Sequence, residues 1–209
     1  MVSDTRSYHH GDLRSALVEA GLRLARDGGS DALGLRSVTR SVGVTPNAAY
    51  RHFADWQALV LAVAAEAQDL AARAMRDRME EATPPPDPAT APPDPAERAL
   101  RRLRGVGLGY IHFALAEPGW FDLAILTLSG PTGPRLAPPY QLLLDTLDEA
   151  VTAGALTPQR RTDAQWVCWS AVHGFADLAT RGPLRRQDRA TVDRLAEHVV
   201  DSVIGDLRR

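Results

Sequence analysis

The sequence predicts an all-α protein of about nine helices, and three observations support this fold class. Apolar residues recur every three or four positions along most of the chain, as one face of an amphipathic helix requires. No stretch shows the strict alternation of apolar and polar residues that is typical of a half-buried strand. Prolines and glycines separate the periodic segments, as they do at helix ends. The chain has 209 residues, of which 44% are hydrophobic, so it can bury a large core.

The first expected helix lies near the N-terminus. Its apolar face follows helical spacing and consists of Leu13, Ala16, Leu17, Ala20 and Leu24. The pair Gly28 and Gly29 ends it. A much longer helix is expected from about Trp56 to Glu81, with Asp55 as its N-cap.

Between these two segments the sequence predicts two short helices joined by a tight turn. Leu35, Val38 and Val42 share the inner face of the first short helix. Gly43 then breaks the pattern, as a turn between crossed helices needs. Thr45 is a good N-cap for the second short helix. Pro46 suits its first position, where an N–H is not needed.

The second short helix has two different faces. Ala49 and Phe53 lie four residues apart and are expected to point inward. The opposite face is small, polar and basic, with Tyr50 at its edge, and it consists of Asn47, Ala48, Arg51 and His52. A short helix with such an outer face suits the major groove of DNA, although any helical hairpin with a solvated face would give the same pattern.

Residues 8–59 resemble the DNA-binding domain of TetR-family transcription regulators. The matching residues include Ala20-Gly21, Gly43-Val44-Thr45 and above all Tyr50-Arg51-His52-Phe53, followed by Leu59. The resemblance implies a three-helix domain with a helix-turn-helix over residues 1–55 that binds double-stranded DNA. It implies DNA contacts from Arg36, Thr45, Asn47, Ala48, Tyr50, Arg51, His52 and Trp56.

Two positions depart from the pattern of that family. Gly34 stands where the family has Ser or Thr, and Trp56 stands where a basic residue anchors a phosphate. The indole N–H of Trp56 can still donate to a phosphate, helped by the helix N-terminus. Packing at the domain junction is an equally good interpretation of Trp56.

The remainder, residues 56–209, is expected to form a helical domain for effector binding and dimerisation. The proline-rich stretch at 83–96 predicts a flexible linker within it, because so many prolines cannot continue a helix. Further helices are expected at 97–116, 119–129, 138–153, 160–180 and 187–207.

A second resemblance lies in residues 166–176. Trp169, His173 and Gly174 are similar to the tryptophan and histidine-glycine element of one group of TetR-family C-terminal domains. Trp169 and His173 are four residues apart and therefore share a helix face. The resemblance to the family implies a small-molecule pocket in this part of the chain.

Aromatic residues concentrate in this C-terminal part. We expect a pocket bounded by Phe113, Trp120, Phe121, Trp169 and His173. It would take a small apolar or aromatic effector with one hydrogen-bonding group, which a histidine orients. The alternative is that the rings only fill the core.

The last expected helix has an apolar stripe that needs a partner surface. Val192, Leu195, Val199 and Val203 repeat every three or four residues along it. The partner is either the core of this chain or a second copy. We expect a homodimer interface at these four residues, with the same patch on both subunits.

Charge and composition limit the other classes of function. The net charge is −2, and residues 1–60 hold seven arginines against six acidic residues, so any DNA contact depends on where the charges lie. Cys168 is the single cysteine and cannot form an internal disulfide. No apolar run is long enough for a membrane span, and no signal peptide is evident, so a cytoplasmic protein is expected. Metal, cofactor and catalytic motifs are absent from the sequence, so no catalytic, metal or cofactor site is predicted.

The sequence therefore predicts a ligand-responsive regulator, and specifically a repressor, that binds a palindromic operator as a homodimer. Two alternatives stay open. One is a helical small-molecule-binding protein or enzyme that uses the aromatic and histidine cluster. The other is a DNA-binding regulator without an effector.

Overall fold

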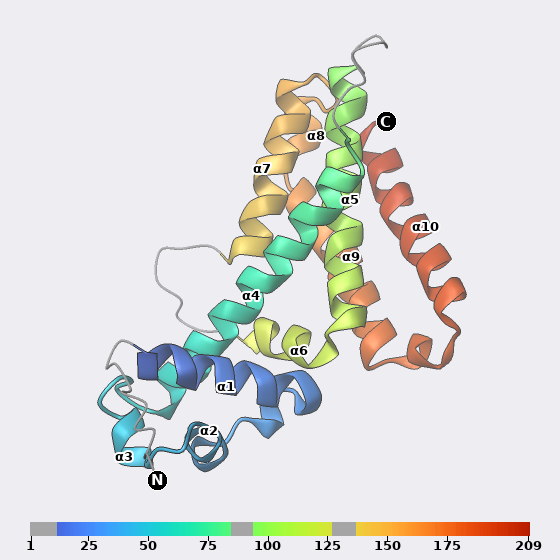
Figure 1. The fold of residues 1–209 in the computed structure, drawn as a ribbon. Coiled ribbons are helices and arrows are strands. Elements are labelled where there is room, and N and C mark those ends of the chain that lie inside the picture. Colours follow the sequence, from blue (N-terminus) through green and yellow to red (C-terminus); the bar gives the residue numbers. More distant parts are fainter. Residues whose placement is uncertain (1–11, 85–93, 127–136) are drawn as a thin grey trace. The chain divides into compact units, whose positions relative to one another are not determined.

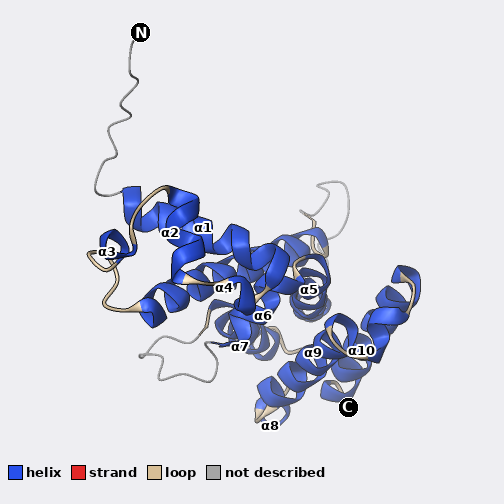
Figure 2. Ribbon diagram, turned by 90° about the horizontal axis from the view of Figure 1, so that it is seen from below, coloured by secondary structure: helices blue, strands red, loops and turns tan. Residues whose placement is uncertain are grey.

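The all-α prediction is confirmed. The structure, a computed structural model, describes residues 12–84, 94–126 and 137–209, and no strand occurs within these ranges (Figure 2). Its elements are α1 (Asp12–Gly28), η1 (Ser30–Ala32), α2 (Leu35–Val42), α3 (Pro46–Ala49), α4 (Trp56–Glu81), α5 (Pro95–Ala116), α6 (Pro118–Leu126), α7 (Pro138–Thr152), α8 (Pro158–Arg161), α9 (Ala164–Thr180), η2 (Pro183–Arg186) and α10 (Arg189–Leu207).

The structure divides one expected helix into two. The helix predicted at 160–180 is present as α8 and α9, separated at Thr162 and Asp163. Asp163 has a left-handed backbone with φ 60°, which an aspartate tolerates better than most residues but which no α-helix continues through. The described residues therefore form ten α-helices, one more than the nine expected.

Two other boundaries also differ from the prediction. The last helix begins at Arg189 because the 3₁₀ turn η2 precedes it. Helix α3 ends at Ala49 and does not reach Phe53. The chain tightens after α3, where the His52 amide donates to the Ala49 carbonyl three residues back at 2.9 Å. The expected linker at 83–96 lies largely outside the described residues, and so does most of the expected break between 129 and 139.

The described chain packs as two compact units. The first unit contains the described parts of residues 1–67 and 119–132, and the second contains those of 68–118 and 133–209. Helix α4 therefore belongs to the first unit up to Ala67 and to the second from Gln68 onward. Nearly all of α6 belongs to the first unit, although it follows α5 in the sequence. The functional division predicted at residue 55 stays a prediction.

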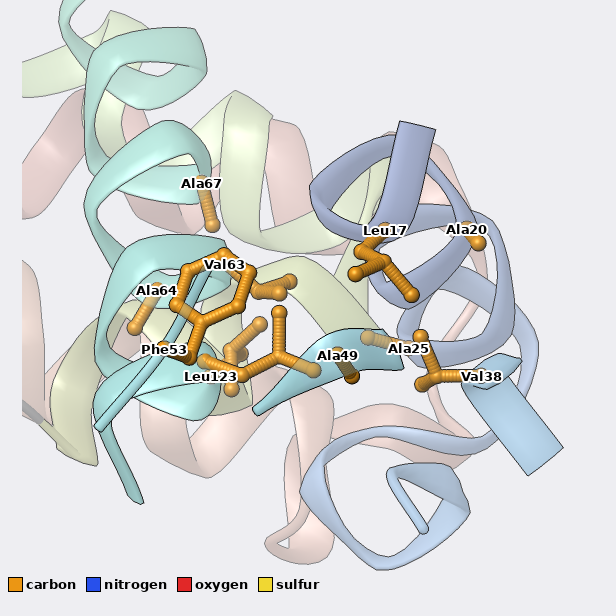
Figure 3. Packing of buried hydrophobic residues seen from close by; sticks show 11 residues of the cluster. Leu17, Ala20, Ala25, Val38, Ala49, Phe53, Val63, Ala64, Ala67 and Leu123 are labelled. Carbon is orange, nitrogen blue, oxygen red and sulfur yellow. The ribbon is translucent and has the colours of Figure 1, made fainter. Parts of the chain in front are cut away.

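The core of the first unit joins α1, α2, α3, the first part of α4, and α6. Figure 3 shows Phe53 beside Val63 and Leu123, with Leu17 and Val38 reaching in from α1 and α2. These side chains are at most 5% exposed, so each removes nearly its whole apolar surface from water. The inward positions predicted for Ala49 and Phe53 are confirmed by their burial.

Helix α5 is central to the second unit. It packs against α7, α9 and α10, and α9 also packs against α10 (Figure 1). Gly105 and Gly109 face the second part of α4, where an added Cβ would come within 2.6 Å of the Cα atoms of Met79 and Met75. These two glycines therefore allow the α4 and α5 backbones to approach closely.

Within the described ranges, no helix combines the length and the apolar character that crossing a bilayer would need.

Candidate nucleic-acid interface and ligand cavity

The turn between α2 and α3 fixes how α3 is presented. Gly43 has φ 77°, a left-handed conformation that glycine adopts without steric cost. The Val44 amide then donates to the Thr39 carbonyl at 3.0 Å, which closes the end of α2. Thr39 is buried and its hydroxyl donates to the Leu35 carbonyl at 2.8 Å. The first of the two short helices thus ends in a hydrogen-bonded turn directly before α3.

Helix α3 begins as the sequence predicts, with one difference. Thr45 has the extended backbone of an N-cap and Pro46 occupies the first helical position. The Thr45 hydroxyl, however, makes no capping hydrogen bond. This hydroxyl lies on an exposed residue and is available to an outside acceptor.

The outer face of α3 and of the turn after it is open to solvent. Asn47 and Arg51 are exposed, and Tyr50 is 48% exposed. Ala48 and His52 are half-buried. The Asn47 amide, the Tyr50 hydroxyl and the Arg51 guanidinium give this face groups that can contact base edges and phosphates.

Two further predicted contact residues lie on neighbouring elements. Arg36 is exposed on α2. Trp56 is half-buried at the start of α4 and packs against the hydrophobic core of the first unit. Asp55 caps that helix as predicted, since its Oδ1 accepts from the Ala58 amide at 2.7 Å.

Helix α6 is bound to α1 by a tryptophan. The Trp120 indole N–H donates to the Leu22 carbonyl at 2.8 Å. The Arg26 guanidinium carbon lies 5.1 Å from the centroid of the Trp120 ring, a distance that allows a cation–π contact. Next along the helix, Asp122 accepts from both the amide and the hydroxyl of Ser30, at 3.2 and 2.9 Å.

The five residues expected to bound a pocket do not all fall in one unit. Trp120 and Phe121 belong to the first unit, and Phe121 is buried there. Phe113, Trp169 and His173 belong to the second. Neither unit by itself brings more than three of the five together.

The second unit contains a connected group of rings. The Tyr110 hydroxyl and His173 Nδ1 lie 2.9 Å apart, in hydrogen-bonding distance. The Trp169 ring is nearly parallel to the His173 ring, with an interplanar angle of 8°. Its centroid lies 5.0 Å from that of the Tyr110 ring. Tyr140 meets Trp169 edge-on at 5.4 Å. Burial lowers the pKa of His173 and raises that of the Tyr110 hydroxyl, so both groups are held in their neutral forms.

Beside this ring group lies a cavity of about 30 Å³ with an almost entirely apolar wall. Helices α4, α5, α7, α9 and α10 all contribute to it. Trp169 is the one residue of the expected five that lines it. Phe113 is buried in α5, and neither it nor His173 lines the cavity.

The pocket expected from the sequence therefore included one of the twelve residues that line this cavity and missed the other eleven. No local pattern could have grouped Met75 of α4 and Val200 of α10 with Trp169, because they are far apart in the sequence. Burial raises the pKa of the Cys168 thiol to about 11, so it stays protonated and unreactive at neutral pH.

The four residues expected at a dimer interface have different surroundings. Val192 is only 5% exposed and belongs to the core of its own chain. Val203 is half-buried and lines the cavity, while Leu195 and Val199 are half-buried elsewhere on α10.

The adjacent helix α9 adds exposed apolar surface. Val167 is 49% exposed and Leu178 45%, and both share one face of α9 with Gly174. Nothing lies within 4 Å of a Cβ placed on Gly174, so this face of α9 is open. Trp166 is also exposed on this helix, at 58%.

The described ranges contain no group of three or more histidine, cysteine, aspartate or glutamate side chains that could hold a metal ion.

The arrangement defines a class of protein, an all-helical chain that presents an exposed short helix after a tight turn. Two family models match it. The model described as bacterial regulatory proteins, tetR family, matches residues 17–63, and that of the tetracyclin repressor-like C-terminal domain matches residues 103–203. The chain belongs to the TetR family and is a DNA-binding transcriptional regulator.

Several solved structures share this fold. A protein with unknown function from Rhodococcus sp. RHA1 is 27% identical, with a TM-score of 0.74, over 98% of this chain and 100% of that one. A TetR family transcription regulator from Marinobacter aquaeolei VT8 is 18% identical, with a TM-score of 0.60, over 91% and 94% of the two chains. A TetR variant from Acinetobacter baumannii AYE, in complex with minocycline, is 18% identical with a TM-score of 0.59 and covers 96% of each chain. No curated protein sequence matches this chain.

Proposed function

We propose that this protein is a ligand-responsive repressor that binds a palindromic operator as a homodimer. The observation that carries the proposal is the outer face of α3 and the following turn. There Asn47, Tyr50 and Arg51 are exposed while Ala49 and Phe53 anchor the same segment in the core. The left-handed turn at Gly43 sets the direction in which the chain continues from α2 into α3.

The exposed side chains suit different parts of the DNA. Asn47 and Arg51 can pair with base edges in the major groove, since an amide matches adenine and a guanidinium matches guanine. The hydroxyls of Thr45 and Tyr50, together with Arg36 on α2, suit phosphate oxygens. Ala48, His52 and Trp56 complete the proposed interface, and for the half-buried Trp56 only its indole N–H could reach a phosphate.

A homodimer would place two such faces on one DNA molecule. Leu195 and Val199 on α10, with Val167 and Leu178 on α9, are the apolar side chains that we propose at its centre. The open surface at Gly174 would let the partner's helix approach closely. An obligate interface of this kind buries on the order of 2,000 Å² or more.

We further propose that a small molecule bound in the second unit controls DNA binding. The cavity beside Trp169 supports this part of the proposal, as does the minocycline bound by the Acinetobacter relative. An effector that binds one state of the dimer better than the other changes operator affinity by linkage. Repression is the expected outcome where the operator overlaps a promoter.

Footprinting of the purified protein on the DNA upstream of its own gene tests the proposal. A dimer should protect two inverted half-sites whose centres lie about 34–36 Å apart or a multiple of this. A single protected half-site, or protection that does not depend on sequence, would contradict operator binding by a dimer.

A further inference from the structure

The chemistry of the cavity in the second unit specifies the ligand more narrowly than the proposed function does. Its wall is almost entirely apolar, and no ionisable carboxylate, guanidinium or imidazole lines it. Three lining side chains, Tyr110, Cys168 and Trp169, carry a hydrogen-bonding group. The Tyr110 hydroxyl is already paired with His173.

A charged or strongly polar group would be unfavourable here. Such a group loses its hydration on entering, and this wall offers it no ion pair and few hydrogen bonds in return. An apolar group needs no such partner and gains free energy in proportion to the surface that it buries.

The cavity is small. It measures about 30 Å³, whereas a cavity known to hold benzene is about 150 Å³, roughly five times larger, so any ligand must displace neighbouring side chains. An unbranched alkyl chain is narrower in cross-section than a ring and therefore needs smaller movements of its neighbours. Met75 is suited to such movement because an unbranched thioether changes rotamer easily.

Two of the lining residues differ in how easily they move. Trp169 packs against Tyr110, Tyr140 and His173, whose ring centroids lie 5.0 to 6.1 Å from that of its own ring. Met75 of α4 is 1% exposed and has a flexible, unbranched side chain. A ligand that enters the cavity therefore displaces Met75 more readily than Trp169.

We propose that this cavity is a binding site for the uncharged, unbranched alkyl chain of a small molecule, and that the chain binds beside Trp169 and Met75 by apolar contact alone. The inference rests on the proposed function, because it names the chemical class of the effector. It narrows the expectation of an apolar or aromatic effector to an alkyl chain and gives no role to a histidine. Each methylene that enters the cavity should raise affinity about fourfold.

Gly107 offers a direct way to fill the site. A Cβ at this position would lie 3.3 Å from Val200 Cγ2 and 3.5 Å from Val172 Cγ1, so Gly107→Ala adds a methyl to the cavity wall. Alanine also favours the helix. Gly205→Ala is the matched control, because Gly205 is also helical but a Cβ there meets nothing within 4 Å.

The experiment uses n-pentane as the probe and the methyl signals of ¹³C-labelled methionine as the readout, in full-length protein without DNA. Met75 lines the cavity, and Met79, one turn further along α4, does not, so the second signal is an internal control. Pentane should shift the Met75 signal to saturation and leave Met79 unchanged. Benzene and n-butylammonium at the same concentration should leave Met75 unchanged. Gly107→Ala should weaken pentane binding at least tenfold, and Gly205→Ala should not change it.

Two results would overturn the inference. One is a Met75 signal that pentane leaves unchanged, and the other is binding of butylammonium or benzene as tight as that of pentane. If Gly107→Ala does not fold, Val172→Ala serves in its place, because widening the cavity should admit benzene. Operator binding by the unliganded wild type is measured in parallel. Its failure would contradict the proposed function, whereas a pentane result bears on the cavity alone.

Discussion

The Trp120 indole donates a hydrogen bond of 2.8 Å to the main-chain carbonyl of Leu22, so a residue from the middle of the sequence is held by the first helix of the chain. This bond joins Trp120 to α1 within the first unit. It also makes α6 part of the unit that carries the helix-turn-helix.

Replacing Trp120 with Phe should therefore destabilise the protein without affecting ligand binding. Loss of the hydrogen bond should cost about 1 kcal/mol of unfolding free energy, since the Leu22 carbonyl loses its indole donor. Urea denaturation measures this change. Trp166→Phe, at a residue that is 58% exposed, is the control and should change stability by less than about 0.5 kcal/mol. Equal effects of the two variants would contradict the role given to Trp120.

Gly43 and Gly205 should respond in opposite ways to alanine. Neither site has an atom within 4 Å of a new Cβ, so only the backbone conformation differs. At Gly43, φ 77° is costly for alanine, and Gly43→Ala should destabilise by about 1 kcal/mol. At Gly205, within α10, alanine should stabilise by up to about 1 kcal/mol. Thermal denaturation of both variants would show the difference in sign, and a stabilised Gly43→Ala protein would contradict the left-handed conformation of Gly43.

Stability should fall when the pH is lowered from about 7.5 to 5.5. Burial lowers the pKa of both His112 and His173 below the ordinary value of 6.5, so the unfolded chain takes up protons first as the pH drops. The loss begins near pH 6.5 and continues down to the pKa of each folded histidine. Each can contribute a slope of at most about 1.4 kcal/mol per pH unit.

Urea denaturation at pH 7.5, 6.5 and 5.5 measures this slope, at pH values where carboxylates with ordinary pKa values remain ionised. A protein with both His112→Gln and His173→Gln should show a flatter dependence on pH, whatever its absolute stability. The same slope in the wild type and the double variant would rule out the two buried histidines as its source.

Substitutions at Val199 and Val192 should have different effects, the first on dimer assembly and the second on folding. Val199 is half-buried on α10, and Val199→Asp should give a folded monomer by sedimentation velocity at micromolar concentration, because a charge at an apolar interface opposes association. Val192 is buried in its own chain, and Val192→Asp should instead unfold the protein. A wild-type protein that sediments as a monomer would contradict the dimer.

Much of the fold followed from local patterns in the sequence. Periodic apolar residues located every helix of α1 to α7 and α10 to within a few residues, and Asp55, Gly43 and Pro46 occupied their expected positions at helix ends. The interruption between α8 and α9 was not predicted, because a left-handed aspartate leaves no trace in the spacing of apolar residues.

The ligand site was harder to predict than the DNA-binding face. The residues of the α3 face are close together in the sequence, so helical spacing alone predicts that Ala49 and Phe53 are buried and that Asn47 and Arg51 are exposed. The cavity draws on five helices, and the association of Trp120 with Leu22 depends on long-range packing. Concentration of aromatic residues in one region showed that rings would be near each other, but not which ring would pack against which helix.

The affinity of Arg51→Ala protein for the operator tests the central claim most directly. Arg23→Ala, which removes an exposed arginine of α1 that lies 3.8 Å from Glu19, is the matched control for loss of charge. At one fixed salt concentration, Arg51→Ala should weaken operator binding by about 1–3 kcal/mol and relax specificity at one base position in each half-site. Arg23→Ala should bind as the wild type does. Unchanged operator affinity in the Arg51→Ala protein, or an equal loss in both variants, would contradict recognition of the operator by this face of the helix-turn-helix.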